Sequence, residues 1–272
     1  MSATLDTAIL KLIRKAADAA IMPRYRQLKA SQVVDKSVGE LVTIADLECE
    51  AMLAEGLAQL LPEATVLGEE AISTNPALAE RLGDRLCWII DPLDGTNNFV
   101  QGTGGFGIMV ALANNGLPIG GWIYDPLSDR FCSAHLNNGA WINGERVQTK
   151  SDNQSKPRAA ISSLYADADY RSELAKSLEN VFSFNSIPRC AAEVYPRLVS
   201  GELDIVLFGR CLAWDHAAGV IFLLEAGGRA ARLDGSAFRV DDDQNGLIAA
   251  SCSQAWERFA EAIAFFECEA NG

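Results

Sequence analysis

Short apolar runs alternate with asparagine-glycine turns between residues 86 and 147, and this pattern constrains the fold more than any other feature of the chain. The turns are Asn114-Asn115-Gly116, Asn137-Asn138-Gly139 and Asn143-Gly144. Asn-Gly pairs favour the tight turns that join neighbouring antiparallel strands. The pattern therefore predicts an antiparallel meander. Its expected strands are Leu86–Ile90, Phe106–Ala113, Pro118–Tyr124, Arg130–Leu136 and Ala140–Ile142.

After the polar stretch Lys150–Pro157, strands and helices alternate. Helices layered against sheets in both halves fit an α+β domain followed by an α/β domain. We therefore predict one domain over residues 1–149 and a second over residues 150–272. The expected strands of the second domain are Ala159–Leu164, Val181–Ser186, Leu203–Phe208 and Gly246–Ala250. Its expected helices are Asp167–Leu178, Ala191–Ser200, Asp215–Ala226 and a last helix from Gln254.

The N-terminal region is expected to supply two further helices. Apolar positions from Leu5 to Ala20 fall on one face of a helix that ends near Pro23. A second helix is predicted from Asp46 to Leu61, before Pro62. Residues 31–40 between them are polar and contain Gly39, which predicts a mobile loop.

Composition excludes several classes of protein. The 272 residues are 49% hydrophobic, enough for one large domain or two intimate ones. No apolar run approaches the roughly 20 residues of a membrane span, and charged residues interrupt any signal-peptide pattern. Seven cysteines without a CxxC pair indicate reduced thiols in a cytoplasmic protein. A net charge of −13 argues against nucleic-acid or anionic-membrane partners.

The segment Asp91-Pro92-Leu93-Asp94-Gly95-Thr96 follows an apolar run and carries two carboxylates. Pro92 cannot donate a ladder hydrogen bond, and Gly95 tolerates unusual backbone angles, so we expect the strand to break at Pro92 and turn at Gly95. Two close carboxylates repel unless a cation lies between them, and oxygen ligands suit Mg²⁺. A helix starting at Thr96 would attract anions with its free N–H groups. The segment therefore predicts a phosphate site beside a divalent cation.

Asp-Pro and Asp-Gly are also ordinary turn dipeptides, and alone they would more often mark only a turn. Two distant segments change that balance, namely Gly68-Glu69-Glu70 and Trp214-Asp215-His216-Ala217-Ala218-Gly219. With Asp46 in Leu41-Val42-Thr43-Ile44-Ala45-Asp46, these motifs resemble the inositol monophosphatase family, which consists of metal-dependent, lithium-sensitive phosphatases. The resemblance runs from about Lys36 to Gly228 and implies a five-layer αβαβα sandwich and a homodimer.

The resemblance also implies a ligand set for two or three Mg²⁺ ions. Glu69, Asp91 and the carbonyl of Leu93 would hold the first ion, and Asp91, Asp94 and Asp215 the second. A third ion would lie near Glu69 through water. Glu69 and Thr96 would orient the attacking water, with Thr96 relaying a hydrogen bond to Asp46, and the N–H groups of Gly95 and Thr96 would bind phosphate. Most ligands would come from the first domain, and Asp215 from the second.

Simpler roles stand beside these. Asp46 and Asp215 each precede or open a predicted helix, where aspartate is a common N-cap. Glu69 and Glu70 could form a solvated loop pair. His216 and His135 are more readily structural residues, because a hard oxygen site does not need imidazole. Lys36 could be an ordinary loop lysine, although the family pattern also has a lysine near the phosphate.

The substrate pocket departs from the family pattern. In inositol-selective members, the resemblance implies an acidic residue seven positions before Asp215, where it accepts a sugar hydroxyl. Phe208 occupies that position and cannot accept such a bond. Arg210 could bind a second anion or face solvent. Ala191 and Glu193 are expected near the pocket, where Glu193 could replace the missing acceptor.

The predicted function is Mg²⁺-dependent hydrolysis of a small phosphate monoester. Inositol monophosphate, fructose 1,6-bisphosphate, 3′-phosphoadenosine nucleotides and histidinol phosphate are the candidate substrates. An alternative from a different class is a non-catalytic regulatory binding protein on the same scaffold, because a fold does not fix a function. A decayed site would mark that alternative, but every expected ligand position keeps its carboxylate.

Overall fold

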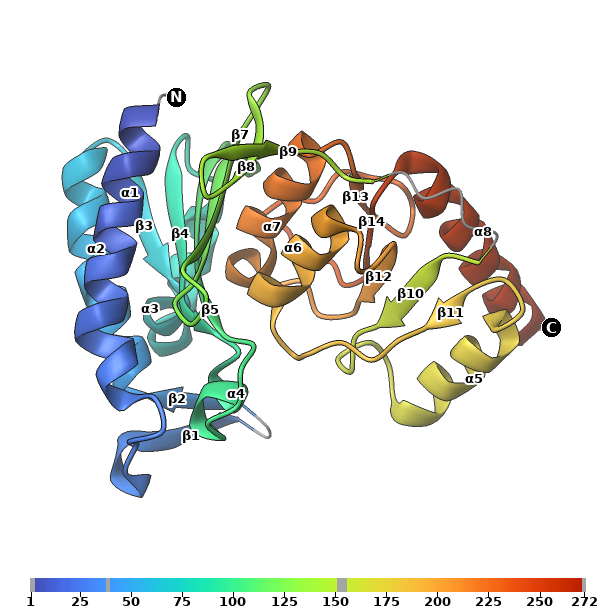
Figure 1. The fold of residues 1–272 in the computed structure, drawn as a ribbon, viewed down its shortest axis with the longest axis horizontal. Coiled ribbons are helices and arrows are strands. Elements are labelled where there is room, and N and C mark those ends of the chain that lie inside the picture. The colour runs from blue at the N-terminus through green and yellow to red at the C-terminus, as the bar shows by residue number, and fades with distance from the viewer. Residues whose placement is uncertain (1–2, 38–39, 151–155, 271–272) are drawn as a thin grey trace.

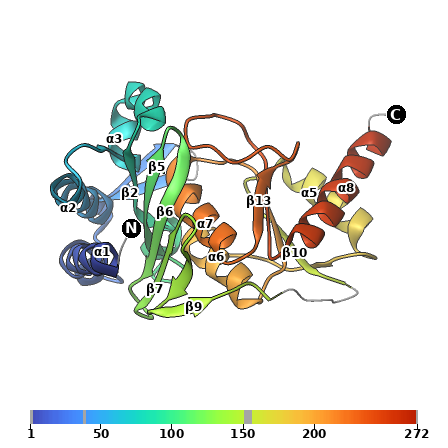
Figure 2. The ribbon, with the colours of Figure 1, turned by 90° about the horizontal axis from the view of Figure 1, so that it is seen from above.

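The computed structural model describes residues 3–37, 40–150 and 156–270, and its elements stack in five layers (Figure 1). Helices α1 and α2 form one outer layer against a seven-stranded sheet, and α6 and α7 separate that sheet from a five-stranded one. Helices α5 and α8 cover the far side, as the view from above also shows (Figure 2). This arrangement confirms the expected αβαβα sandwich. The helices are α1 (Ala3–Ala16), α2 (Ile44–Leu60), α3 (Glu69–Thr74), α4 (Thr96–Val100), α5 (Ala168–Leu178), α6 (Ala191–Ser200), α7 (Ala213–Glu225) and α8 (Ser253–Ala270).

The N-terminal helices follow their sequence signals. Helix α1 continues through a π-helical turn at Ala17–Ile21 into a 3-10 turn at Met22–Arg24, so the chain leaves the helix at Pro23 as predicted. Helix α2 begins two residues before the predicted Asp46 because Thr43 is the N-cap. The apolar faces of both helices are buried against the large sheet. Among the described residues, the structure contains no helix with the length and apolarity of a membrane span.

Residues 33–37 and 40–43 form an antiparallel ribbon of β1 (Val33–Ser37) and β2 (Glu40–Thr43), so the mobile-loop prediction is wrong for the described part of residues 31–40. Gly39 lies outside the described residues. The register pairs Val33 with Thr43 and Val34 with Val42, and β-branched side chains favour such an extended conformation. The polar character of the segment obscured these few β-forming residues. The ribbon places Lys36 on a strand rather than a free loop.

The seven-stranded sheet has the order β3-β4-β5-β6-β7-β8-β9, and the chain from β4 to β9 confirms the predicted antiparallel meander. Strand β3 pairs in parallel with β4 and was not predicted. At the β5–β6 turn, Asn115 and Gly116 have φ of 48° and 80°, which only such turn residues adopt readily. The strands are β3 (Thr65–Gly68), β4 (Cys87–Asp94), β5 (Gly107–Asn114), β6 (Leu117–Asp125), β7 (Arg130–His135), β8 (Gly139–Ile142) and β9 (Glu145–Val147).

Strand β4 does not break at Pro92 as predicted but continues to Asp94 through an irregularity in its pairing. Asp91 pairs with Met109 and Asp94 with Gly107, so Pro92 and Leu93 together face the single residue Ile108. This is the pattern of a β-bulge, which accommodates a proline without an N–H and redirects the neighbouring side chains. The turn then follows at Gly95, as expected.

The five-stranded sheet has the order β11-β10-β12-β14-β13, with β10 parallel to both β11 and β12 and the other pairs antiparallel. Helices α6 and α7 lie between the two sheets, and glycines allow their close approach. A Cβ on Gly121 of β6 would lie 2.6 Å from the carbonyl oxygen of Ala218 in α7. The proposed division at residues 149 and 150 stays a prediction. The strands are β10 (Arg158–Ile161), β11 (Ser183–Phe184), β12 (Ile205–Phe208), β13 (Arg229–Arg232) and β14 (Leu247–Ala250).

Candidate active site

A cavity of about 110 Å³ lies where the end of β4 meets the first turns of α6 and α7. It brings together segments that are far apart in the sequence, including the acidic residues expected to bind metal. The predicted site residues that line it are Glu69, Asp91, Leu93, Asp94, Gly95, Thr96, Ala191, Phe208, Arg210 and Asp215. Three other predicted residues, Lys36, Asp46 and Glu193, lie outside this lining.

The turn after β4 has little conformational freedom. Asp91 accepts a hydrogen bond from the backbone N–H of Leu93 at 3.0 Å, which fixes its carboxylate beside the bulge. Gly95 has φ of 85°, and a Cβ there would lie 2.5 Å from the carbonyl oxygen of Gly105. Only glycine fits this position. Helix α4 starts at the next residue, Thr96, and Gly95 and Thr96 line the same cavity as the carboxylates.

Thr96 connects the turn to the buried start of α2. Its hydroxyl lies 3.1 Å from a carboxylate oxygen of Asp46 and 2.9 Å from the carbonyl oxygen of Leu93. Asp46 is not the N-cap, because Thr43 has that position, and the Asp46 carboxylate accepts the N–H of Thr43 at 2.8 Å in a capping box. Burial raises the pKa of Asp46 to about 6, although its bonds from Thr43 lower it. Asp46 is thus both part of the cap and the partner of Thr96.

Lys36 and Glu50 hold the Glu69-Glu70 segment in place. The Lys36 ammonium lies 2.9 Å from Glu69 and 2.5 Å from Glu70, so it is an ion-pair partner rather than a plain loop lysine. Glu50 of α2 accepts the backbone N–H groups of Glu70 and Ala71 at 2.8 and 2.9 Å. Sequence analysis missed Glu50, because nothing marks a mid-helix glutamate as a cap for a distant helix.

The acidic side chains in the cavity repel one another when they are ionised. Burial, followed by the charges of Glu69, Asp94 and Asp215, raises the pKa of Asp91 well above its ordinary value. The pKa of Asp215 is likewise raised by burial and then by Asp94 and Glu69, while burial raises that of Asp94 to about 6. Concentrated negative charge of this kind, built only from oxygen donors, fits a hard divalent cation. Within the described ranges, no three acidic, histidine or cysteine residues form a preassembled metal-binding cluster.

The second half of the chain contributes the opposite wall. Asp94 accepts the backbone N–H of Ala192 at 2.5 Å and lies 3.2 Å from the Cys190 thiol. Arg189 also lines the cavity, and the sequence analysis did not single it out. The positive charges of Arg210 and Arg189 lower the pKa of Asp215, against the larger effect of burial, so both guanidinium groups act on that carboxylate.

Aromatic packing explains Phe208 and His216. The Phe208 ring stacks on Tyr195 at 5.6 Å between ring centroids and meets the His216 ring edge-on at 4.7 Å. His216 is buried and hydrogen-bonded to the Tyr195 hydroxyl and the Arg210 carbonyl, at 2.9 and 3.2 Å, which supports a structural role. His135 is also buried and bonds to Asp6 at 2.7 Å.

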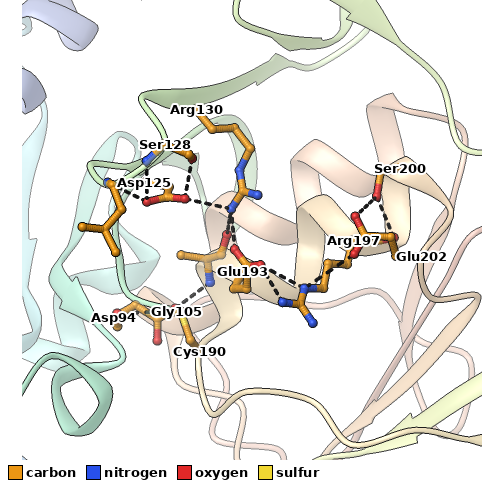
Figure 3. A network of polar contacts seen from close by, with 12 residues as sticks. Asp94, Gly105, Asp125, Ser128, Arg130, Cys190, Glu193, Arg197, Ser200 and Glu202 are labelled. Atoms are coloured by element: carbon orange, nitrogen blue, oxygen red, sulfur yellow. Dashed lines mark hydrogen bonds and ion pairs between the residues drawn. The ribbon is translucent and has the colours of Figure 1, made fainter. Parts of the chain in front are cut away.

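Glu193, the suggested replacement for the missing sugar acceptor, is paired with two arginines and does not line the cavity. Its carboxylate lies 2.6 Å from Arg130 of β7 and 2.9 Å from Arg197, one helical turn along α6 (Figure 3). Each of the two carboxylate oxygens thus already accepts a hydrogen bond from a guanidinium group. Glu193 therefore belongs to a polar network beside the cavity rather than to its lining.

Known proteins resemble this chain in sequence and in fold. The model of the inositol monophosphatase family matches residues 2–267. The chain is 29% identical to "Inositol monophosphatase 2" of Solanum lycopersicum, covering 83% of this chain and 87% of that protein. It is 32% identical to "3′(2′),5′-bisphosphate nucleotidase CysQ" of Escherichia coli strain K12, covering 80% and 87%. An IMPase structure from Thermotoga maritima superposes with a TM-score of 0.82 at 24% identity, covering 98% and 99%, which shows the same fold.

Proposed function

Because this chain belongs to the inositol monophosphatase family, a family of phosphatases, we propose that it hydrolyses a small phosphate monoester with Mg²⁺ as cofactor. The observation that carries the proposal is the convergence of Glu69, Asp91, Asp94 and Asp215 on one cavity beside the Gly95 turn. Bound Mg²⁺ would supply positive charge for the phosphate and the leaving oxygen and would lower the pKa of water.

The proposed ligand roles are those that the family resemblance implies. The charges of Glu69, Asp94 and Asp215 all act on Asp91, and we assign Asp91 to both of two ions. Glu69 and the Leu93 carbonyl would complete the first ion's protein ligands. Asp94 and Asp215 would complete those of the second, with a third ion held near Glu69 through water. All these donors are oxygen atoms, which suits Mg²⁺.

Thr96 is proposed to orient the attacking water. When its hydroxyl donates to Asp46, its lone pairs remain to accept a hydrogen bond from that water. The Glu69 carboxylate would accept the water's other proton. The backbone N–H groups of Gly95 and Thr96 would bind the phosphate oxygens, because the start of a helix favours an anion. Lys36 would balance the charge of Glu69 and Glu70.

For the substrate, we propose a broad range rather than tight selectivity for inositol monophosphate. Phe208 offers no acceptor for a ring hydroxyl, and Glu193 is held by two arginines. Arg189 and Arg210 beside Asp215 favour a second candidate, a substrate with two phosphate groups. The similarity to a bisphosphate nucleotidase supports that candidate. A site that lacks a hydrogen-bond partner for a given hydroxyl discriminates only weakly between substrates with and without that hydroxyl.

Phosphate release tests the proposal. The purified protein is assayed with inositol 1-phosphate, fructose 1,6-bisphosphate, adenosine 3′,5′-bisphosphate and histidinol phosphate, each with Mg²⁺ and with EDTA. We expect Mg²⁺-dependent release from at least one substrate, inhibition by LiCl but not by matched NaCl, and no release by Asp91→Asn. Absence of release from every substrate would favour a non-catalytic binding protein.

A further inference from the structure

We infer that the ion pair between Arg130 and Glu193 is a positioning device that holds Asp94 in its ligand geometry through the first turn of α6. The inference rests on the proposed function, because it takes Asp94 to be a Mg²⁺ ligand. Arg130 and Glu193 are positioning residues and do not touch the substrate. Figure 3 shows how Arg130, Glu193, Cys190 and Asp94 follow one another from β7 to β4.

Arg130 contacts the first turn of α6 at two points. Its Nη2 donates to the carboxylate of Glu193 at 2.6 Å and also lies 3.5 Å from the carbonyl oxygen of Ala192. The Arg130 and Glu193 side chains are 24% and 18% exposed, so the contact is largely shielded from solvent. A carboxylate oxygen of Asp125 lies 3.8 Å from the same Nη2. The Asp125 carboxylate is itself held by the N–H of Leu127, which donates to it at 2.8 Å.

The same turn of α6 binds the metal-ligand candidate. The Ala192 N–H donates to the Asp94 carboxylate at 2.5 Å, while the Ala192 carbonyl faces Arg130. The Cys190 thiol lies 3.2 Å from the same carboxylate oxygen. The peptide groups of one helical turn thus connect Arg130 to Asp94. A movement of that turn would change the direction of the hydrogen bond that orients the carboxylate.

Arg130 adds an ion pair between this turn and the large sheet, beside the direct contacts of Ala192 and Cys190 with Asp94. Arg197 also binds Glu193, at 2.9 Å, but both residues belong to α6, so that pair moves with the helix. Arg130 belongs to β7, in the same sheet as Asp94 on β4. The Arg130–Glu193 pair therefore helps to set the position of the α6 start relative to Asp94, which the pair within the helix cannot do.

Loss of the Arg130–Glu193 ion pair should lower the affinity for Mg²⁺ and not only the stability of the protein. Removing a residue that orients a metal ligand typically costs roughly 10-fold to 100-fold in metal affinity. Arg130 acts one step further away, so we expect the Mg²⁺ dissociation constant to rise about 10-fold in Arg130→Ala and in Glu193→Ala. Because both substitutions break one connection, the double variant should lose no more than about either single variant. Arg130→Lys should recover part of the affinity.

Arg24→Ala is the matched control. Arg24 is 22% exposed, donates to Glu48 at 2.8 Å and to the carbonyl of Ala20 at 2.7 Å, and does not line the cavity. It thus resembles Arg130 in exposure and in the kinds of partner it binds. Any general effect of losing a half-buried guanidinium should appear in Arg24→Ala as a lower melting temperature, with wild-type Mg²⁺ affinity.

Calorimetric titration with MgCl₂ gives a readout that does not depend on turnover, and circular dichroism checks each variant's fold. A rise in the dissociation constant for Arg130→Ala and Glu193→Ala, but not for Arg24→Ala, supports the inference. Unchanged affinity in folded variants, or an equal loss in Arg24→Ala, overturns it. Should Arg130→Ala not fold, the milder Arg130→Lys and Glu193→Gln decide by the same criterion. If the wild-type protein itself binds no Mg²⁺, the proposed function fails. If the wild-type protein binds Mg²⁺ and the folded variants bind it equally well, only this inference fails.

Discussion

The hydroxyl of Thr96 lies 3.1 Å from the carboxylate of Asp46, and this contact joins the first turn of α4 to the first turn of α2. Asp46 is buried and is held on its other oxygen by Thr43. Asp46 and the Leu93 carbonyl, at 2.9 Å, are thus the two acceptors that restrict the orientation of the Thr96 hydroxyl. A hydroxyl with a fixed acceptor on one side presents its lone pairs in a fixed direction on the other.

We predict that Thr96→Ala lowers kcat by roughly 100-fold while KM changes little, because the substitution removes orientation of the water but leaves the backbone N–H groups for the phosphate. Thr96→Ser keeps the hydroxyl and should retain most of the activity. Steady-state phosphate release measures both constants. A change confined to KM would make Thr96 a substrate-binding residue.

The four acidic ligands should not be equivalent. Asp91→Asn should reduce turnover to near background at every Mg²⁺ concentration, because Asp91 faces the charges of three other carboxylates and would serve both ions. Asp215→Asn should instead raise the Mg²⁺ concentration needed for half-maximal activity, with partial recovery at high Mg²⁺. Activity measured over a Mg²⁺ series compares the two. Near-normal turnover by Asp91→Asn would refute its assignment as a ligand.

The metal-free protein should lose stability as pH rises from about 4 to about 7. Burial raises the pKa of Asp94 and of Asp46 from the ordinary 3.8 to about 6, so in this window the folded chain holds protons that the unfolded chain has released. Such a difference favours the folded state at the acidic end and is lost as the pH passes the folded pKa. Bound Mg²⁺ should offset the repulsion between the deprotonated carboxylates and compete with protons for them.

Thermal unfolding with EDTA and with MgCl₂, at pH 5 and pH 7.5, checks this pH dependence. We expect Mg²⁺ to raise the melting temperature more at pH 7.5 than at pH 5. In Asp94→Asn, the decline of the melting temperature with pH in EDTA should be shallower than in the wild-type protein. An equal Mg²⁺ effect at both pH values would contradict the prediction.

Arg210 should determine the response to a second phosphate. We predict that Arg210→Ala lowers kcat/KM for adenosine 3′,5′-bisphosphate by about 10-fold relative to adenosine 3′-monophosphate, since a charge-assisted contact of this kind contributes about 1.5 kcal/mol or more. Arg229→Ala, which removes a half-buried arginine paired with Glu257, is the control. Equal losses on both nucleotides would instead place Arg210 at the phosphate that is cleaved.

Phe208→Glu is a poorer test of substrate choice, because it would bury a carboxylate between the Tyr195 and His216 rings.

Local sequence signals predicted the elements whose conformation depends only on neighbouring residues. Asn115-Gly116 and Asn143-Gly144 require the positive φ angles of tight turns, so the meander could be predicted from residues 86–147 alone. The Asp91–Thr96 segment likewise carries its own turn chemistry, and the family resemblance supplied Glu69 and Asp215 as its distant partners. Glu69, Asp215 and every residue of the segment except Pro92 line one cavity in the structure.

Only the tertiary structure decided which side chains hold the others in place. Glu50 binds the backbone of Glu70 and Ala71, Lys36 pairs with both glutamates, and Glu193 turns to Arg130 instead of the cavity. Each of these contacts joins elements that are distant in sequence, and a glutamate or lysine carries no local mark of the partner it will meet. A turn is encoded by the backbone preferences of its own residues, whereas a long-range ion pair depends on how whole layers pack.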